Sequence, residues 1–116
     1  MKSGKINIEE RAKGFNDSHE ARELELFIMN TYEVYARHYV PMVKMLARRV
    51  KRGDYDRARA LVACERVVYH AAREYMRTYC GSNENIRDIF PVGVRCAVAL
   101  ELERYAADYI EEGGAA

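Results

Sequence analysis

Arginine residues recur at regular spacing in the middle of the chain and are the first candidates for a binding function. Four of them fall on one edge of a predicted helix, at intervals of seven, seven and four residues: Arg59, Arg66, Arg73 and Arg77. Three more come before that helix: Arg48, Arg49 and Arg52. Guanidinium groups pair with carboxylates and phosphates in a fixed, bidentate geometry. The pattern therefore predicts a surface for a macromolecule with an acidic surface, and a solvated helix face without a partner is the alternative.

The charge of the chain is concentrated in the same region. The net charge is only +1, but residues 44–77 carry 10 basic and 4 acidic residues, and residues 78–116 carry 3 basic and 7 acidic ones. Such a basic segment is typical of a surface that binds an acidic protein or a nucleic acid. Alternatively, it neutralises the acidic C-terminal segment, within one chain or across a dimer. The predicted arginine-rich helix holds no Asn or Gln, the side chains that read adenine. A protein partner is therefore the first hypothesis and a nucleic acid the second.

Glu65 is the candidate buried polar residue. It lies within the apolar stripe of the same predicted helix, between Leu61 and Val68. A lone carboxylate in that position would be costly unless it were paired or hydrogen-bonded. Three interpretations stay open: a pair with an arginine or tyrosine of a neighbouring helix, a place in an oligomer interface, or a catalytic role. We expect the structural pair, because buried ion pairs commonly serve structure alone.

The sequence holds no pattern typical of a metal centre, a nucleophile or a cofactor site. No histidine has a glutamate three residues before it, so the Glu-x-x-His pair of di-iron bundles is missing at His19, His38 and His70. The cysteines are odd in number and widely spaced, which predicts free thiols at Cys64, Cys80 and Cys96. Neither Gly-x-Ser-x-Gly nor a glycine-rich phosphate loop occurs. We therefore expect a non-enzymatic protein without metal or cofactor.

The elements that position these residues are predicted to be helices. Apolar residues spaced by three and four predict helices over 17–40, 41–52, 55–79 and 91–110, with Asp17 and Asp54 as N-caps and Gly53 as a stop. Pro41 predicts a kink or break near 38–41. The predicted inward stripes include some large side chains: Tyr32, Tyr35, Val62 and Tyr69. Short loops favour a small antiparallel bundle of three long helices plus one short or kinked helix.

The domain prediction is one helical unit with two loose ends. Residues 1–16 are expected to form a loose arm, with an extended stretch over 5–8, residues 17–110 the bundle domain, and residues 111–116 a flexible tail. No apolar run is long enough to span a bilayer and the N-terminus lacks a signal-peptide pattern, so we expect no membrane partner and a cytoplasmic location. Surplus apolar residues on the first predicted helix indicate a homodimer.

Three short stretches resemble small uncharacterised all-helical proteins of bacterial phages and other mobile elements. These stretches are Phe15-Asn16, Asn30-Thr31-Tyr32-Glu33 and Lys51-Arg52-Gly53-Asp54-Tyr55-Asp56. The resemblance covers about residues 15–110, and its motifs are helix caps and stripe positions. It implies a context in which small proteins bind host or phage proteins and some inhibit host defence systems, and it transfers no functional residue.

Overall fold

The computed structural model describes residues 7–81 and 83–114, and every regular element within them is a helix. The all-helical class predicted from the sequence is therefore confirmed. The elements in chain order are α1 (Ile8–Ala12), α2 (His19–Asn30), α3 (Tyr32–Val34), the π-helical turn η1 (Tyr35–Tyr39), α4 (Val40–Arg52), α5 (Arg57–Tyr79), α6 (Ile86–Ile89) and α7 (Val92–Glu111).

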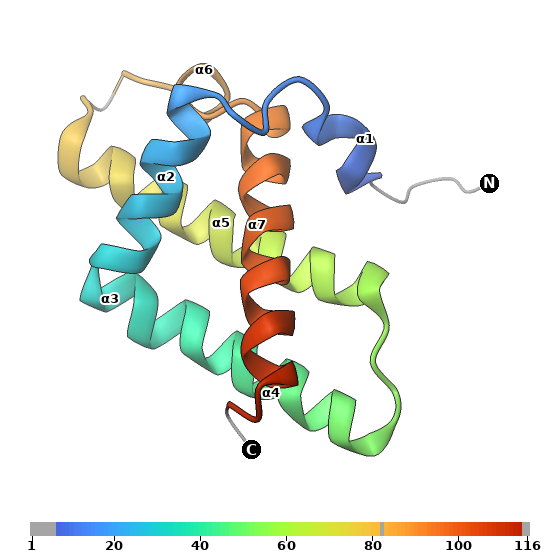
Figure 1. Ribbon diagram of the computed structural model, residues 1–116. Coiled ribbons are helices and arrows are strands. Elements are labelled where there is room, and N and C mark those ends of the chain that lie inside the picture. The colour runs from blue at the N-terminus through green and yellow to red at the C-terminus, as the bar shows by residue number, and fades with distance from the viewer. Residues whose placement is uncertain (1–6, 82, 115–116) are drawn as a thin grey trace.

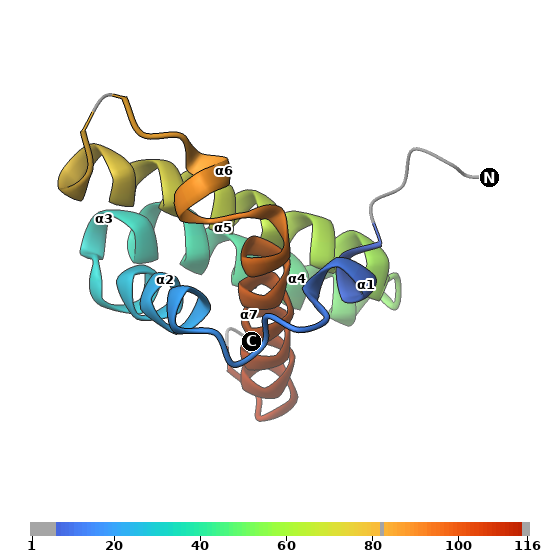
Figure 2. The ribbon, with the colours of Figure 1, turned by 90° about the horizontal axis from the view of Figure 1, so that it is seen from above.

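Helix α7 occupies the centre of the fold. Helices α4 and α5 run side by side in opposite directions, and α7 crosses both steeply, with α2 and α1 on either side of its N-terminal half (Figures 1 and 2). Most α7 side chains that face these neighbours are small or apolar and buried: Val94, Cys96, Ala97, Val98, Ala99, Leu102 and Ala106. The predicted antiparallel bundle of three long helices is not confirmed, because α7 crosses the α4–α5 pair instead of lying along it.

The first predicted helix is interrupted at Thr31. Ser18, and not Asp17, caps α2, because its hydroxyl oxygen accepts a hydrogen bond from the Ala21 amide at 3.1 Å. Thr31 has extended backbone angles, φ −104° and ψ 107°, which end α2 and rotate the following turn. As a result Tyr32 is 80% exposed while Val34 is only 2% exposed. The predicted stripe through Tyr32 and Tyr35 is therefore wrong.

Pro41 lies at the predicted irregularity. The turn before it is π-helical: the Val40 amide donates to the carbonyl of Tyr35, five residues back. This wider turn accommodates the proline, which lacks an amide proton and crowds the carbonyl four residues before it. Helix α4 then continues from Val40 without a break until Gly53, whose left-handed φ of 75° ends it as predicted.

The buried face of helix α5 is rotated from the predicted one and shares Leu61, Val68 and Ala72 with it. Its N-cap is Asp56, not Asp54, since the Asp56 carboxylate accepts from the Ala58 amide at 3.0 Å. Val62 and Tyr69 are exposed, and the buried positions include the smaller side chains Ala60, Cys64, Ala71 and Ala72. Two apolar stripes with helical spacing lie side by side on this helix. The one with small residues is buried because closely crossing helices need small side chains at the contact.

The described part of the predicted N-terminal arm is folded onto α7. Residues 1–6 lie outside the described residues, but Ile8 and Ala12 of α1 are buried in the same core as α7. The Asn7 side chain caps α1 by accepting from the Glu10 amide at 3.0 Å. Gly93 of α7 lies against the Phe15 ring, and a Cβ there would stand 2.9 Å from the Arg11 carbonyl oxygen. A glycine is thus required where the two segments meet.

Candidate functional site

The predicted arginine edge of α5 lines two separate hollows. Arg59 and Arg66 line a groove between α5 and α4, whereas Arg73 and Arg77 line a cleft between α5 and the α3–η1 segment. Both hollows lie along the side of α5 that faces the chain from Glu33 to Arg49. The structure therefore divides the edge that the sequence predicted as one surface.

The groove between α4 and α5 combines arginines with an apolar floor. It has a volume of about 740 Å³, and Arg49 of α4 faces Arg59 and Arg66 of α5. Its apolar lining comes from both helices: Met45, Leu46, Ala58, Ala60, Val62 and Ala63. Among the described residues that line it, Asp56 is the one acidic side chain. We call this hollow the basic groove.

The three arginines of the basic groove differ in their contacts. The Arg49 Nε donates to the Met45 sulfur at 3.2 Å, and the Arg59 Nε lies 3.7 Å from an Asp56 carboxylate oxygen. Within the described residues Arg66 forms no ion pair. Guanidinium groups that are unmatched or held by an exposed pair can exchange to a new carboxylate at little cost, because exposed ion pairs contribute about 0–1 kcal/mol.

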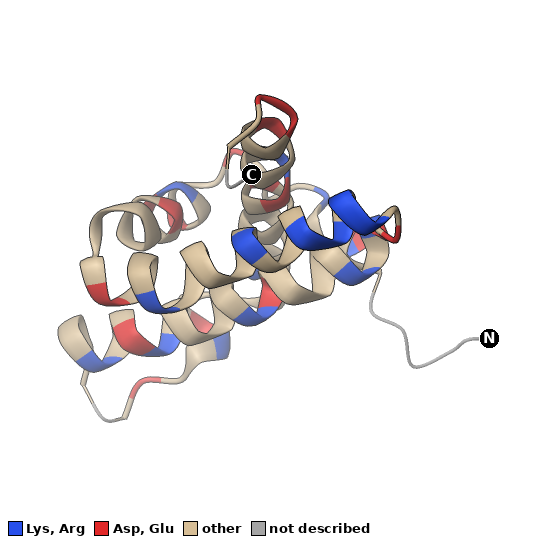
Figure 3. Ribbon diagram, turned by 90° about the horizontal axis from the view of Figure 1, so that it is seen from below, with Lys and Arg blue, Asp and Glu red and all other residues tan. Residues whose placement is uncertain are grey.

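Two further predicted residues lie outside the lining of the groove. Arg48 and Arg52 are exposed on α4, and Arg52 lies 3.5 Å from Asp54 just beyond the helix end. Seen from below, Lys and Arg residues gather along α4 toward this end, while Asp and Glu residues cluster on the C-terminal part of α7 (Figure 3). Arg48 and Arg52 thus extend the positive potential beside the basic groove, although their side chains do not line it.

The second hollow holds two stacked histidines. His38 of η1 and His70 of α5 have ring centroids 4.9 Å apart with an interplanar angle of 13°. The cleft around them has a volume of about 410 Å³. Its acidic residues are each matched by an arginine: Glu33 lies 3.2 Å from Arg37, and Glu74 lies 2.8 Å from Arg77. The sequence predicted Arg73 and Arg77 as binding residues, but nothing in it indicated that His38 and His70 stack against each other.

Glu65 pairs with Arg95 of α7. A carboxylate oxygen lies 3.6 Å from the Arg95 guanidinium, and the two side chains are 20% and 11% exposed. The Arg95 Nε also donates to the Phe90 carbonyl at 3.0 Å, and its guanidinium carbon lies 5.6 Å from the centre of the Tyr69 ring. This is the geometry of the first interpretation, a pair with an arginine of a neighbouring helix, and it ties α5 to the start of α7.

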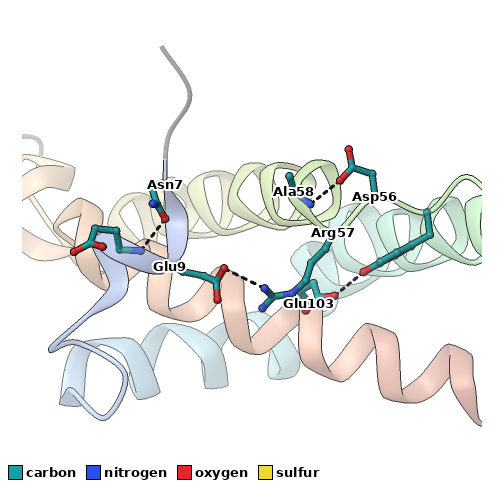
Figure 4. A network of polar contacts seen from close by, with 8 residues as sticks. Asn7, Glu9, Asp56, Arg57, Ala58 and Glu103 are labelled. Carbon is teal, nitrogen blue, oxygen red and sulfur yellow. Dashed lines mark hydrogen bonds and ion pairs between the residues drawn. The ribbon is translucent and has the colours of Figure 1, made fainter. Parts of the chain in front are cut away.

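Sequence reasoning missed a second acidic residue, Glu103. It is the one charged residue among the buried positions that the structure describes, with 6% exposure. The Tyr55 hydroxyl donates to it at 2.5 Å, and Arg57 lies 3.5 Å from it and 3.1 Å from Glu9 of α1 (Figure 4). Burial, then the hydrogen bond to Glu103, raises the pKa of the Tyr55 hydroxyl above its ordinary value. One sequence signal indicated this burial. Glu103 is spaced by four residues from Ala99 and by three from Ala106, so the three residues form a second stripe beside the predicted one on the same helix.

Comparison with known proteins assigns this chain to no family, and the described side chains form no metal-binding group. No protein-family model, no curated protein and no solved structure matches the chain. In residues 7–81 and 83–114, no three His, Cys, Asp or Glu side chains are grouped so that they could hold a metal ion. Over the same residues, no helix has the length and apolar character needed to cross a membrane. Within the described residues, Arg49, Arg59 and Arg66 meet in the basic groove, and Arg73 and Arg77 meet in the cleft of the stacked histidines.

Proposed function

We propose that the protein is a non-enzymatic binding module that holds an acidic segment of a partner protein in the basic groove. The observation that supports this proposal is the meeting of Arg49, Arg59 and Arg66 over an apolar floor, between two helices. Such a groove suits a segment that carries Asp or Glu beside apolar side chains. The acidic groups would face the arginines, and the apolar groups would lie on Val62 and its neighbours.

The two parts of the groove would contribute differently to binding. Exposed ion pairs add little affinity each, so the arginines mainly steer the partner and set its orientation. The favourable free energy would come mainly from the apolar floor, at about 25 cal/mol per Å² of apolar surface removed from water, before the entropy cost of association is subtracted. Val62 is 43% exposed in the free protein and is the apolar lining residue best placed to gain from a partner.

A nucleic acid is the second candidate for the same arginines. The described lining of the groove includes no aromatic residue on which a base could stack, and Asp56 would repel a phosphate backbone at one end. These two features favour a protein segment. Nucleic-acid binding instead predicts an affinity that falls steeply as salt is added.

Site-specific photo-crosslinking tests where the partner lies. A photoreactive phenylalanine analogue replaces Val62 in the basic groove, and the matched control carries it at Leu26, which is 54% exposed on α2. In cells that express the protein, the proposal predicts a discrete protein adduct from position 62 and none of the same mass from position 26.

Two results would contradict this proposal. The first is an identical adduct pattern at both positions, which would mean that the groove is not the contact. The second is an adduct at position 62 that nuclease removes, which would support the nucleic-acid alternative. The predicted homodimer and the phage or mobile-element context stay predictions. Host or phage proteins are the partner classes that the resemblance implies.

A further inference from the structure

The cleft that contains the stacked histidines has more positive than negative groups. Its charged lining comes from two sides: Glu33, Arg37 and His38 on the α3–η1 segment, and His70, Arg73, Glu74 and Arg77 on α5. Glu33 and Glu74 each have an arginine within 3.2 Å or less. Within the described residues Arg73 has no carboxylate partner, and its guanidinium carbon lies 5.9 Å from the centre of the Tyr69 ring. Arg73 and the two imidazoles are therefore the groups of the cleft that have no carboxylate partner among the described residues.

The surroundings of His38 in the cleft disfavour its protonation. Burial, then the charges of His70 and Arg37, lowers the pKa of His38, against an opposing effect from Glu74. Two protonated rings at a centroid distance of 4.9 Å would repel one another. A bound anion would reverse this balance, because it attracts both rings and the Arg73 guanidinium.

We propose that the cleft binds a tetrahedral oxyanion of the phosphate type, held by Arg73, His38 and His70, and that binding tightens as the pH falls. A phosphate group suits this set better than a carboxylate, because it offers three or four oxygens to donors that approach from two different elements. The same chemistry is available from free phosphate or from a phosphorylated side chain. This cleft is separate from the basic groove, so the inference does not depend on the proposed function.

The pH dependence follows from proton uptake. If the anion raises the imidazole pKa values, the complex binds more protons than the free protein, and affinity rises as the pH falls. The limit is about tenfold per pH unit for each proton taken up. Sulfate is the best first probe, because it stays a dianion between about pH 6 and about pH 7.5, where histidine titrates. Any change of affinity with pH then comes from the protein.

The test is an NMR titration of the His38 and His70 ring resonances with sulfate, against sodium chloride at equal ionic strength. The expected result is a saturable shift of both rings, tighter by about tenfold at about pH 6 than at about pH 7.5. Repeating the titration with inorganic phosphate and with phosphoserine amide distinguishes the two sources by their relative affinities.

Variants make the result specific to the cleft. Arg73→Gln and His70→Gln should each remove the saturable shift of the His38 ring. Arg22→Gln, an exposed arginine of α2 outside the cleft, should leave it unchanged. If one of the two cleft variants fails to fold, as judged by circular dichroism, the titration of the other still tests whether the cleft binds the anion. A shift no larger than that with chloride, or one that persists in the folded cleft variants, would overturn the inference.

Discussion

The Tyr55 hydroxyl donates a hydrogen bond of 2.5 Å to the buried carboxylate of Glu103. This contact joins the loop before α5 to the middle of α7, across 48 residues of sequence. Arg57 extends the link, because it lies within ion-pair distance of both Glu103 and Glu9. Segments near the start, middle and end of the chain are thus held together by one polar cluster (Figure 4).

Tyr55→Phe tests the contribution of this cluster to stability. The phenyl ring keeps the packing, but the Glu103 carboxylate loses a donor in a position where water has little access. We expect the free energy of unfolding to fall by about 1–3 kcal/mol, measured by urea denaturation. Tyr109→Phe is the matched control, because Tyr109 is 52% exposed, and it should change stability by less than about 0.5 kcal/mol. Equal stability of the two variants would show that the Tyr55–Glu103 contact is not important.

Gly93→Ala tests the close approach of the N-terminal segment to α7. The added methyl group would collide with the Phe15 ring and stand 2.9 Å from the Arg11 carbonyl, so the backbone itself must move. We expect a loss of about 1–3 kcal/mol in unfolding free energy. Hydrogen exchange should also be faster at the amides of α1, because this segment is pushed off α7.

A second glycine provides the control for that experiment. A Cβ at Gly81 meets no atom within 4 Å, and its φ is not in the left-handed region. Gly81→Ala should therefore leave both stability and the exchange of α1 close to those of the wild type. If Gly93→Ala behaved like Gly81→Ala, the described packing of residues 8–15 on α7 would be wrong.

The three cysteines should react at very different rates in the folded protein. Burial raises the pKa of the Cys64 thiol to about 12, and burial also raises that of Cys96. Both side chains are fully buried, whereas Cys80 is partly exposed at the end of α5. Because the thiolate is the reactive form, a thiol reagent at mildly alkaline pH should label Cys80 first.

Mass spectrometry of the labelled peptides checks this order. The wild type should gain one label quickly in the native state and three labels in denaturant. Cys80→Ser should gain none quickly and two in denaturant. Rapid native labelling of Cys64 or Cys96 would contradict the burial of the α5–α7 contact.

Sequence patterns predicted the helices well where local signals decide them. Gly53 ends α4 because its backbone adopts a left-handed conformation, and Pro41 marks the π-helical turn because it removes one backbone donor. These effects act within one or two turns of the chain. They need no knowledge of what packs against the segment.

Packing direction could not be predicted in the same way. Helix α5 carries two overlapping apolar stripes, and its packing against α7 and α4 determines that Cys64 is buried while Val62 faces the basic groove. The extended conformation of Thr31 likewise exposes Tyr32, and the one local signal before it, Asn30, does not by itself indicate how the next turn is rotated. Long-range geometry, not propensity, creates both hollows.

The central claim is that the basic groove binds an acidic partner protein, and a charge-reversal capture experiment tests it most directly. The baits are the wild type, Arg59→Glu/Arg66→Glu in the groove, and Arg22→Glu/Arg87→Glu on α2 and α6, which has the same change in net charge. Each bait is first shown to be folded and is then applied to nuclease-treated extract of cells that express the protein. Our account predicts a protein retained equally by the wild type and the control, and weakened by about tenfold or more with the groove variant, because like charges would face each other. A partner retained equally by all three baits would contradict it.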